Sequence, residues 1–239
     1  MDIGKSFTFV FEDEDWIVKV LIGAAILLVG ILFFWVLLVP LILAFLLLAG
    51  YGAEITRRVI RGDAQTLPEW NDWGALITDG LKVFVIVVVY ALPFIIISAC
   101  LGVPVGILSN AGTGAAQAWS SLFGTILGIL NFLWAIAVSI LVPAAIAFFI
   151  DHDDLAAAFR FGEVFAFVRE HFATYLITFL MSWVAEVIGG LGAILCGVGW
   201  FATMPYSYMV IGHLYGQAYL TAKGVRTQPV VVDELAESA

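Results

Sequence analysis

The sequence predicts an all-α protein, a polytopic bundle of membrane-spanning helices. Of its 239 residues, 63% are hydrophobic and 12% are charged, whereas soluble domains carry about 25% charged residues. The apolar residues form long unbroken runs, such as residues 20–49 and 126–150, rather than the short alternating segments of a barrel. Because only helices and closed barrels satisfy the backbone in lipid, these observations favour a multi-pass helical membrane domain and exclude an ordinary soluble domain.

The first apolar run, residues 20–49, is too long for one upright span. Thirty helical residues would extend about 45 Å, against a hydrocarbon core of about 30 Å. Either one strongly tilted helix or a tight hairpin of two helices fits this length. Pro40 disfavours a helix that continues through it, so we expect residues 16–34 and 41–55 to form a hairpin.

The distribution of Lys and Arg residues along the sequence indicates the number of spans. Six spans place all ten Lys and Arg residues on one side, and the opposite loops, residues 102–120 and 190–199, carry no charge. By the positive-inside rule, both termini are then cytoplasmic, and we expect a multi-pass protein of the plasma membrane. Residues 1–222 form one membrane domain, followed by an acidic tail at residues 223–239. The predicted spans are residues 16–34, 41–55, 78–101, 121–150, 172–189 and 200–220.

An amphipathic helix is predicted at residues 66–80, on the cytoplasmic side of the membrane. Thr66 and Glu69 have the spacing of a capping box. Trp70 and Trp73 lie on its apolar face, and tryptophan suits the level of the lipid headgroups. We therefore expect both tryptophans to be membrane-interface residues.

Three arginines at the end of the second predicted span, Arg57, Arg58 and Arg61, are also expected at the membrane interface. Glu54 precedes the first two with i, i+3 and i+4 spacing. This group would bind a lipid headgroup or a partner. The alternative is an interfacial ion pair with arginines that extend towards the headgroups.

A second amphipathic helix is predicted at residues 154–171, because apolar residues recur there at helical spacing. The preceding Asp-His-Asp-Asp run, residues 151–154, carries ligand types suited to hard metal ions. Calcium and magnesium sites need spaced ligands that wrap around the ion, and none follow. Helix capping explains the run, so we expect no metal site and no cofactor.

Motifs around the second and third predicted spans resemble those of a known family. They are Gly50-Tyr51, Arg57, Gly62, the Leu-Pro-Glu-Trp-Asn-Asp run at residues 67–72, Asp-Gly-Leu-Lys at residues 79–82, Tyr90 and Pro93. The chain resembles the prokaryotic multi-pass membrane family known as domain of unknown function 4013, from about Phe7 to Tyr219. The resemblance implies a bacterial or archaeal membrane protein of this topology. It implies no catalytic residue.

Polar side chains recur along one face of each of the last two predicted spans. They are Thr174, Thr178, Ser182 and Glu186 in the fifth span, and Thr203, Tyr206, His213 and Gln217 in the sixth. Because ionisable groups within a span are costly in lipid, we hypothesise that the two sets face each other and line a polar seam for a solute or a proton. Alternatively, the hydroxyls bond within their own helix or join helices, and Glu186 reaches the outer interface.

Glycine pairs with small-xxx-small spacing are expected to permit close helix approach, within the chain or between copies of it. These pairs are Gly102/Gly106, Gly124/Gly128 and Gly212/Gly216.

Three classes of function remain after this reading. The favoured one is a non-enzymatic scaffold or accessory subunit with membrane lipids as partners, together with a membrane-protein partner or a second copy of the chain. The alternative is a small transporter or channel that uses the polar seam, and the third is a metal-dependent lipid-modifying enzyme. A net charge of −9 without a basic surface excludes nucleic acid. A water-filled cavity that reaches Glu186 would favour the transporter.

Overall fold

The described part of the chain is helical throughout. The computed structural model describes residues 2–32, 39–63, 67–194 and 199–225, and these contain no strand, which confirms the all-α class. The elements in order are α1 (Ile3–Thr8), η1 (Phe9–Glu12), α2 (Trp16–Leu32), α4 (Val39–Arg61), α5 (Trp73–Ser109), α6 (Gly114–His152), η2 (Leu155–Phe159), α7 (Phe161–Glu170), α8 (Phe172–Leu191), η3 (Gly192–Ile194) and α9 (Trp200–Ala222).

Four stretches among the described residues are long and apolar enough to cross a membrane. They are Val39–Arg61, Trp73–Ser109, Gly114–His152 and Phe172–Ile194. The first and last predicted spans coincide with α2 and α9, which fall outside this set; α2 contains a shorter apolar stretch, Trp16–Ile31.

The first apolar run forms two helices that pack side by side, in agreement with the predicted hairpin. A Cβ placed on Gly30, near the end of α2, would lie 2.9 Å from the Cβ of Ala44 in α4. Pro40 occupies the first turn of α4, where a helix makes no use of the missing N–H. The connecting residues 33–38 lie outside the described part of the chain.

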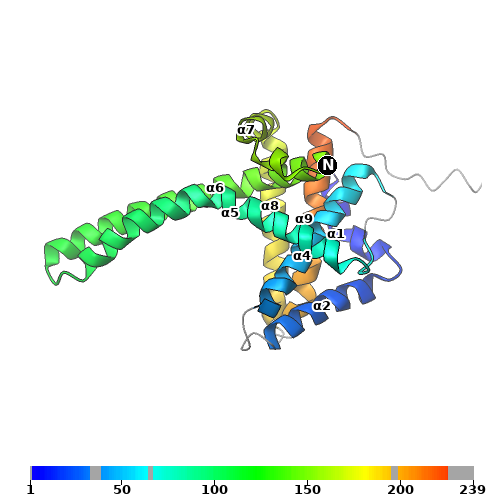
Figure 1. Ribbon diagram of the computed structural model, residues 1–239, viewed down its shortest axis with the longest axis horizontal. Helices are drawn as coiled ribbons and strands as arrows, with labels where there is room; N and C mark the ends of the chain where they lie inside the picture. Colours follow the sequence, from blue (N-terminus) through cyan, green and yellow to red (C-terminus); the bar gives the residue numbers. More distant parts are fainter. Residues whose placement is uncertain (1, 33–38, 64–66, 195–198, 226–239) are drawn as a thin grey trace, which may run out of the picture.

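The third and fourth spans are longer than predicted. Of the expected loop at residues 102–120, only residues 110–113 are non-helical. The turn is placed by Gly112, which has φ +70°, and by Thr113, whose side chain caps α6. The distal parts of α5 and α6, residues 92–134, project from the rest of the molecule, and we call them the α5–α6 arm (Figure 1). At 37 residues, α5 is about 55 Å long.

The amphipathic helix predicted at residues 66–80 is not a separate element, and this prediction is corrected. Residues 67–72 are not helical, and α5 begins at Trp73 and continues directly into the apolar stretch. Asp72 rather than the capping box begins the helix, because its side chain accepts a hydrogen bond from the backbone N–H of Ala75. Thr66 lies outside the described residues.

The amphipathic helix predicted at residues 154–171 is divided into η2 and α7. Arg160 separates them with ψ 65°, outside the helical range. The side chain of Asp154 caps η2 by accepting from the N–H of Ala156. His171 then separates α7 from α8.

Glycine brings α4 into backbone contact with its neighbours. A Cβ on Gly50 of α4 would overlap the backbone of α5, and a Cβ on Gly80 of α5 would overlap the backbone of α4. A Cβ on Gly212 of α9 would likewise overlap Gly52. Such contacts let helices pack closely without large side chains between them, and α4 thereby becomes the central helix.

The predicted close approach at glycine pairs is confirmed for Gly212/Gly216 and wrong within the chain for the others. A Cβ on Gly216 would meet Val59 of α4. Gly102, Gly106 and Gly128 face open space, and Gly124 has only an ordinary contact at 3.7 Å. These four glycines lie in the α5–α6 arm, where none of the described helices outside the arm comes within 4 Å of a Cβ placed on them.

Candidate functional site

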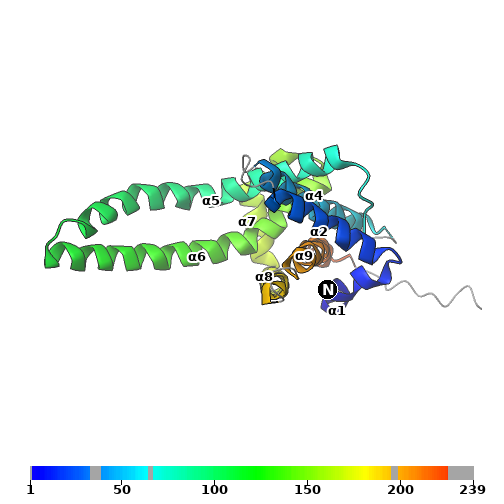
Figure 2. The same cartoon turned by 90° about the horizontal axis from the view of Figure 1, so that it is seen from below.

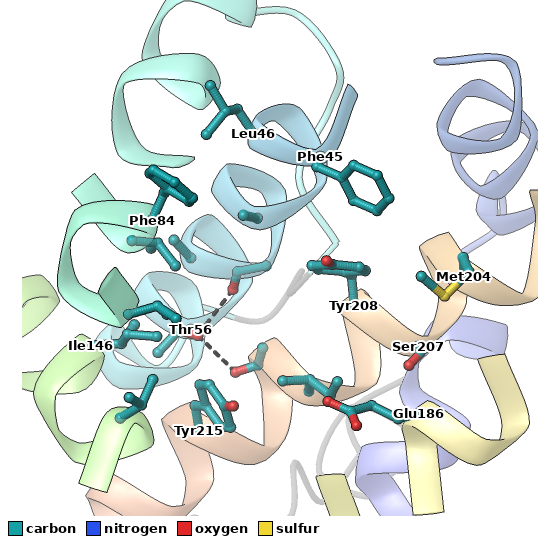
Figure 3. Close-up of a pocket in the computed structure, with 18 of the residues that line it drawn as sticks. Phe45, Leu46, Thr56, Phe84, Ile146, Glu186, Met204, Ser207, Tyr208 and Tyr215 are labelled. Atoms are coloured by element: carbon teal, nitrogen blue, oxygen red, sulfur yellow. Dashed lines mark hydrogen bonds between the residues drawn. The ribbon is translucent and has the colours of Figure 1, made fainter. Parts of the chain in front are cut away.

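A cavity of about 520 Å³ lies where α4, α5, α6, α8 and α9 meet. Its walls are mainly apolar and include Phe45, Phe84 and Ile146 (Figure 3). Cavities that bind small molecules are typically apolar, between about 300 and 1,000 Å³, with a few polar groups that orient the ligand. The cavity therefore has the size and character of a ligand site.

The course of the helices leaves this space open. The parts of α5 and α6 nearest the rest of the molecule run across the α8–α9 pair rather than alongside it, as both views show (Figures 1 and 2). The glycine contacts nevertheless hold α4 against both α5 and α9. The cavity occupies the region where these two helix pairs diverge, and Gly190 at the end of α8 has nothing within 4 Å of a Cβ placed on it.

Five polar side chains line the cavity, and one of them carries a formal charge. Glu186 comes from α8, Thr56 from α4, and Ser207, Tyr208 and Tyr215 from α9. Among the described lining residues there is no lysine, arginine or histidine. Glu186 is therefore the charged group of the site, as the sequence suggested, but its neighbours differ from those predicted.

The hydroxyl of Thr56 joins two helices beside the cavity. It lies 3.0 Å from the carbonyl oxygen of Gly52 in its own helix and 2.8 Å from that of Gly212 in α9 (Figure 3). Thr56 is 1% exposed, so the bond is shielded from competing water. This contact fixes the α4 wall of the cavity against its α9 wall.

The predicted α9 ladder contacts the N-terminal segment rather than the α8 ladder, so the two sets do not form one seam. The hydroxyl of Tyr206 donates to the carbonyl of Phe7 at 2.8 Å. The side chain of Gln217 accepts from the backbone N–H of Asp2 at 3.0 Å. Helical spacing correctly placed these residues on one face, but a different element covers that face.

His213 is buried under the same segment. Its Nδ1 lies 3.0 Å from the Oγ of Ser6, and its ring stacks on Phe9 with 4.1 Å between centroids. The imidazole is 3% exposed. His213 thus fastens the N-terminal segment to α9 and does not face Glu186.

The remaining ladder residues bond locally or join α8 to α9. Thr178 donates to the carbonyl of Thr174, four residues earlier, as the alternative interpretation expected. Ser182 is buried on α8. Thr203 donates to the carbonyl of Gly189 at 2.6 Å and so holds the two last helices together.

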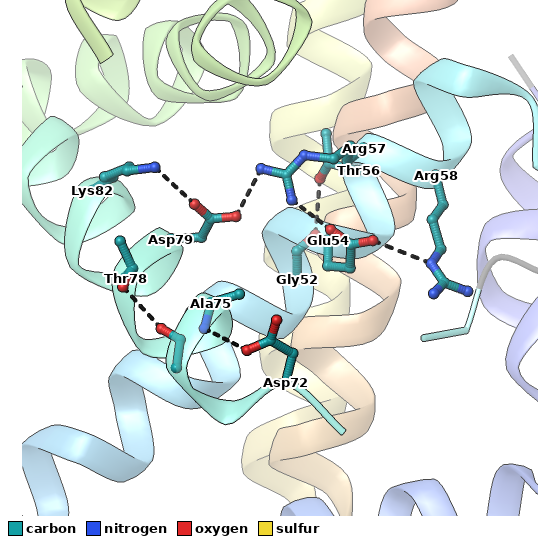
Figure 4. A network of polar contacts seen from close by, with 11 residues as sticks. Gly52, Glu54, Thr56, Arg57, Arg58, Asp72, Ala75, Thr78, Asp79 and Lys82 are labelled. Atoms are coloured by element: carbon teal, nitrogen blue, oxygen red, sulfur yellow. Dashed lines mark hydrogen bonds and ion pairs between the residues drawn. The ribbon is translucent and has the colours of Figure 1, made fainter. Parts of the chain in front are cut away.

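A chain of ion pairs joins α4 to α5 next to the cavity (Figure 4). Arg57 pairs with Glu54 in its own helix and with Asp79 of α5 at 2.7 Å. Arg58 pairs with Glu54 at 3.3 Å, and Lys82 with Asp79 at 3.1 Å. The sequence predicted the pairing within α4, but the contribution of α5 depends on tertiary structure. The spacing of residues along the sequence therefore did not predict the ion pairs with Asp79.

The two predicted interface tryptophans have different surroundings. Trp70 is 8% exposed, stacks on Tyr51 at 4.1 Å between ring centroids, and donates its indole N–H to the carbonyl of Lys19 at 3.1 Å. Trp73 is 42% exposed. Arg61 is exposed at the end of α4. Trp70 therefore anchors the segment before α5 inside the protein, whereas Trp73 and Arg61 lie on its surface.

Lys19, one of the ten cations that the six-span prediction places on the cytoplasmic side, is buried within the protein. Its side chain is 2% exposed and pairs with Asp13 at 2.8 Å and with Glu69 at 2.9 Å. The first partner precedes α2 and the second lies in the segment before α5. This cluster ties three parts of the chain together.

The acidic run at residues 151–154 is used for structure. Asp151 accepts from Lys223 at 2.7 Å and from the hydroxyl of Tyr219 at 2.9 Å. Burial lowers the pKa of Lys223, but its interactions with Asp151 and Tyr219 more than offset that effect. The pKa of Lys223 therefore lies above its ordinary value. The described residues contain no group of three or more His, Cys, Asp or Glu side chains placed to hold a metal ion.

Over residues 2–32, 39–63, 67–194 and 199–225, the structure is helical, with four stretches suited to cross a membrane and a largely apolar pocket that these and α9 enclose. The chain belongs to the family described as protein of unknown function DUF4013, whose model matches residues 33–198. No curated protein matches the chain, and no solved structure does.

Proposed function

We propose that the protein is a small transporter or carrier that binds a small amphipathic molecule in the cavity between α4, α5, α6, α8 and α9. The supporting observation is that a cavity of ligand size reaches Glu186. The cavity expected of a transporter was water-filled, whereas this one is mainly apolar and suits a carrier of an amphipathic molecule. The binding residues are those of the cavity rather than those of a seam between the last two helices.

The shape and lining of the cavity support a carrier over a water-filled channel. Its walls are mainly aliphatic and aromatic, with polar groups on the sides formed by α4, α8 and α9. A lining of this kind suits a ligand with a large apolar part and one polar part. Such a molecule partitions into the bilayer and would reach the site from there.

Native mass spectrometry of the detergent-extracted protein tests the proposal. Gly190→Phe would place a ring on the face of α8 that Glu186 shares four residues earlier and that lines the cavity, and its Cβ would meet no other atom within 4 Å. Gly102→Phe is the matched control, since that glycine also faces open space but lies in the arm. We expect the wild type and the control to retain a small molecule that the Gly190 variant loses. Retention by all three proteins, or by none, would contradict the proposal.

The membrane arrangement belongs to the same proposal. We expect a prokaryotic plasma-membrane protein with six spans, α2 and α9 included, and with both termini in the cytoplasm. The support is the distribution of lysine and arginine, which six spans place on one side. Labelling of cysteines introduced near Lys5 and Lys223 from either side of sealed vesicles would measure it.

A second candidate function, a scaffold, is favoured by the α5–α6 arm. Large apolar side chains are exposed along the arm. Near the middle of α6, the amide of Asn131 bonds to the Oγ of Ser98 at 3.3 Å and is otherwise exposed. Polar side chains within spans commonly hydrogen-bond between helices, so a second copy of this arm is the expected partner. If so, Asn131→Leu would shift the oligomeric state measured by light scattering.

A further inference from the structure

We propose that the cavity selects a cationic ligand, a bulky apolar molecule with one positive charge that is neutralised by Glu186. This inference rests on the proposed function and adds the charge of the ligand to it. The supporting observation is that a carboxylate lines an apolar cavity whose described lining residues include no cation.

The charges around the cavity have a consistent sign. The cations Arg57 and Lys82 are adjacent in sequence to residues that line the cavity. Both form ion pairs with carboxylates between α4 and α5. Glu186 has no such partner among the described residues and points towards the cavity from the opposite wall (Figure 3). The site therefore offers one acidic group and no basic one.

Glu186 is exposed on the surface of the protein, and a carboxylate without an ion pair is costly there because this part of α8 would face lipid. An ionised group away from water needs a counter-charge or hydrogen-bond donors. The hydroxyls of Tyr208 and Tyr215, which line the same cavity, supply donors but no charge. A cationic ligand would supply the missing charge, whereas an anionic ligand would add a second negative charge to the same space.

The walls suit the apolar part of such a ligand. Phe45, Phe84, Tyr208 and Tyr215 place four aromatic rings around the cavity, and aromatic faces attract cations within about 6 Å. Gly190, in the last turn of α8, also lines the cavity. The C-terminal end of a helix carries partial negative charge, although here the carbonyls of Gly189 and Gly190 accept hydrogen bonds from Thr203 and from the N–H of Gly192. The aromatic rings, the helix end and the carboxylate all favour a ligand with a positive charge.

Two ions of nearly equal size and shape and opposite charge provide the probes: tetraphenylphosphonium and tetraphenylborate. Binding of radiolabelled tetraphenylphosphonium to the full-length protein in a non-ionic detergent is measured by equilibrium dialysis. We expect saturable binding that unlabelled tetraphenylphosphonium displaces and tetraphenylborate at the same concentration does not. This comparison uses the wild-type protein and needs no variant to fold.

Three variants test whether the carboxylate of Glu186 is the group that binds the cation. Glu186→Gln should weaken binding of the cation by about ten-fold or more, the usual effect of losing a charged partner. Glu170→Gln, an exposed acid on α7, is the matched control and should bind as the wild type does. Glu186→Asp keeps the charge and should bind more tightly than the Gln variant.

The outcomes separate the two proposals. If both ions bind equally and Glu186→Gln has no effect, while Gly190→Phe abolishes binding, the cavity is a ligand site but the inference about charge is wrong. If binding of the cation is absent, the inference about charge is also overturned. If binding occurs but Gly190→Phe leaves it unchanged, the cavity is not the site and the proposed function fails as well.

Discussion

Gly80→Ala should destabilise the protein although alanine forms helices better than glycine. The new Cβ would overlap the carbonyl of Leu46, which belongs to the backbone of α4 and cannot rotate away. The two helices would have to separate, and overpacking of this kind costs about 1–3 kcal/mol. Helix propensity returns about 1 kcal/mol, so we expect a net loss of up to about 2 kcal/mol.

Gly102→Ala is the matched control because it lies in the same helix and faces open space. The gain in helix propensity is common to both variants and cancels between them. The difference in their free energies of unfolding therefore isolates the cost of overpacking at Gly80, about 1–3 kcal/mol. Unfolding by dodecyl sulfate in mixed micelles, followed by tryptophan fluorescence, measures this difference. Equal stability of the two variants would refute the backbone contact between α4 and α5.

Three further substitutions test other contacts by the same unfolding measurement. Thr56→Val removes the hydroxyl that bridges α4 and α9 and should cost about 1 kcal/mol, whereas Thr125→Val, at an exposed site in the arm, should cost less. Lys19→Met removes the buried cation that pairs with both Asp13 and Glu69 and should cost about 3 kcal/mol, and exposed Arg169→Met should be close to neutral. Ser6→Ala removes the partner of a buried imidazole nitrogen and should cost about 1–3 kcal/mol. An unchanged stability in any of the three would contradict the contact it tests.

Much of the fold follows from the apolar runs, because lipid requires continuous helices for long apolar segments. The hairpin of α2 and α4 was predictable because Pro40 interrupts a run too long for one span. The lengths of α5 and α6 were not. The sequence reading ended both spans near the thickness of a bilayer, whereas α5 continues through Pro93 and Pro104 as far as Ser109. Its end is set by Gly112 and Thr113.

The candidate site was predictable only in its charged member. A carboxylate within an apolar run identified Glu186, but the other polar groups of the cavity come from different helices. Helical periodicity shows which residues share a face, and not which element covers that face. His213 illustrates the limit, since its partner Ser6 lies 207 residues away in the sequence.

Protection of a cavity cysteine from labelling tests most directly that the cavity is a ligand site. Gly190→Cys would be placed in a chain whose Cys100 and Cys196 are serine, with Val187→Cys as control. Val187 is 41% exposed on α8 and does not line the cavity. In lipid vesicles, we predict that a thiol reagent labels the cysteine at position 190 and that tetraphenylphosphonium slows this labelling without affecting position 187. Equal labelling at both positions with no protection at either would contradict the account.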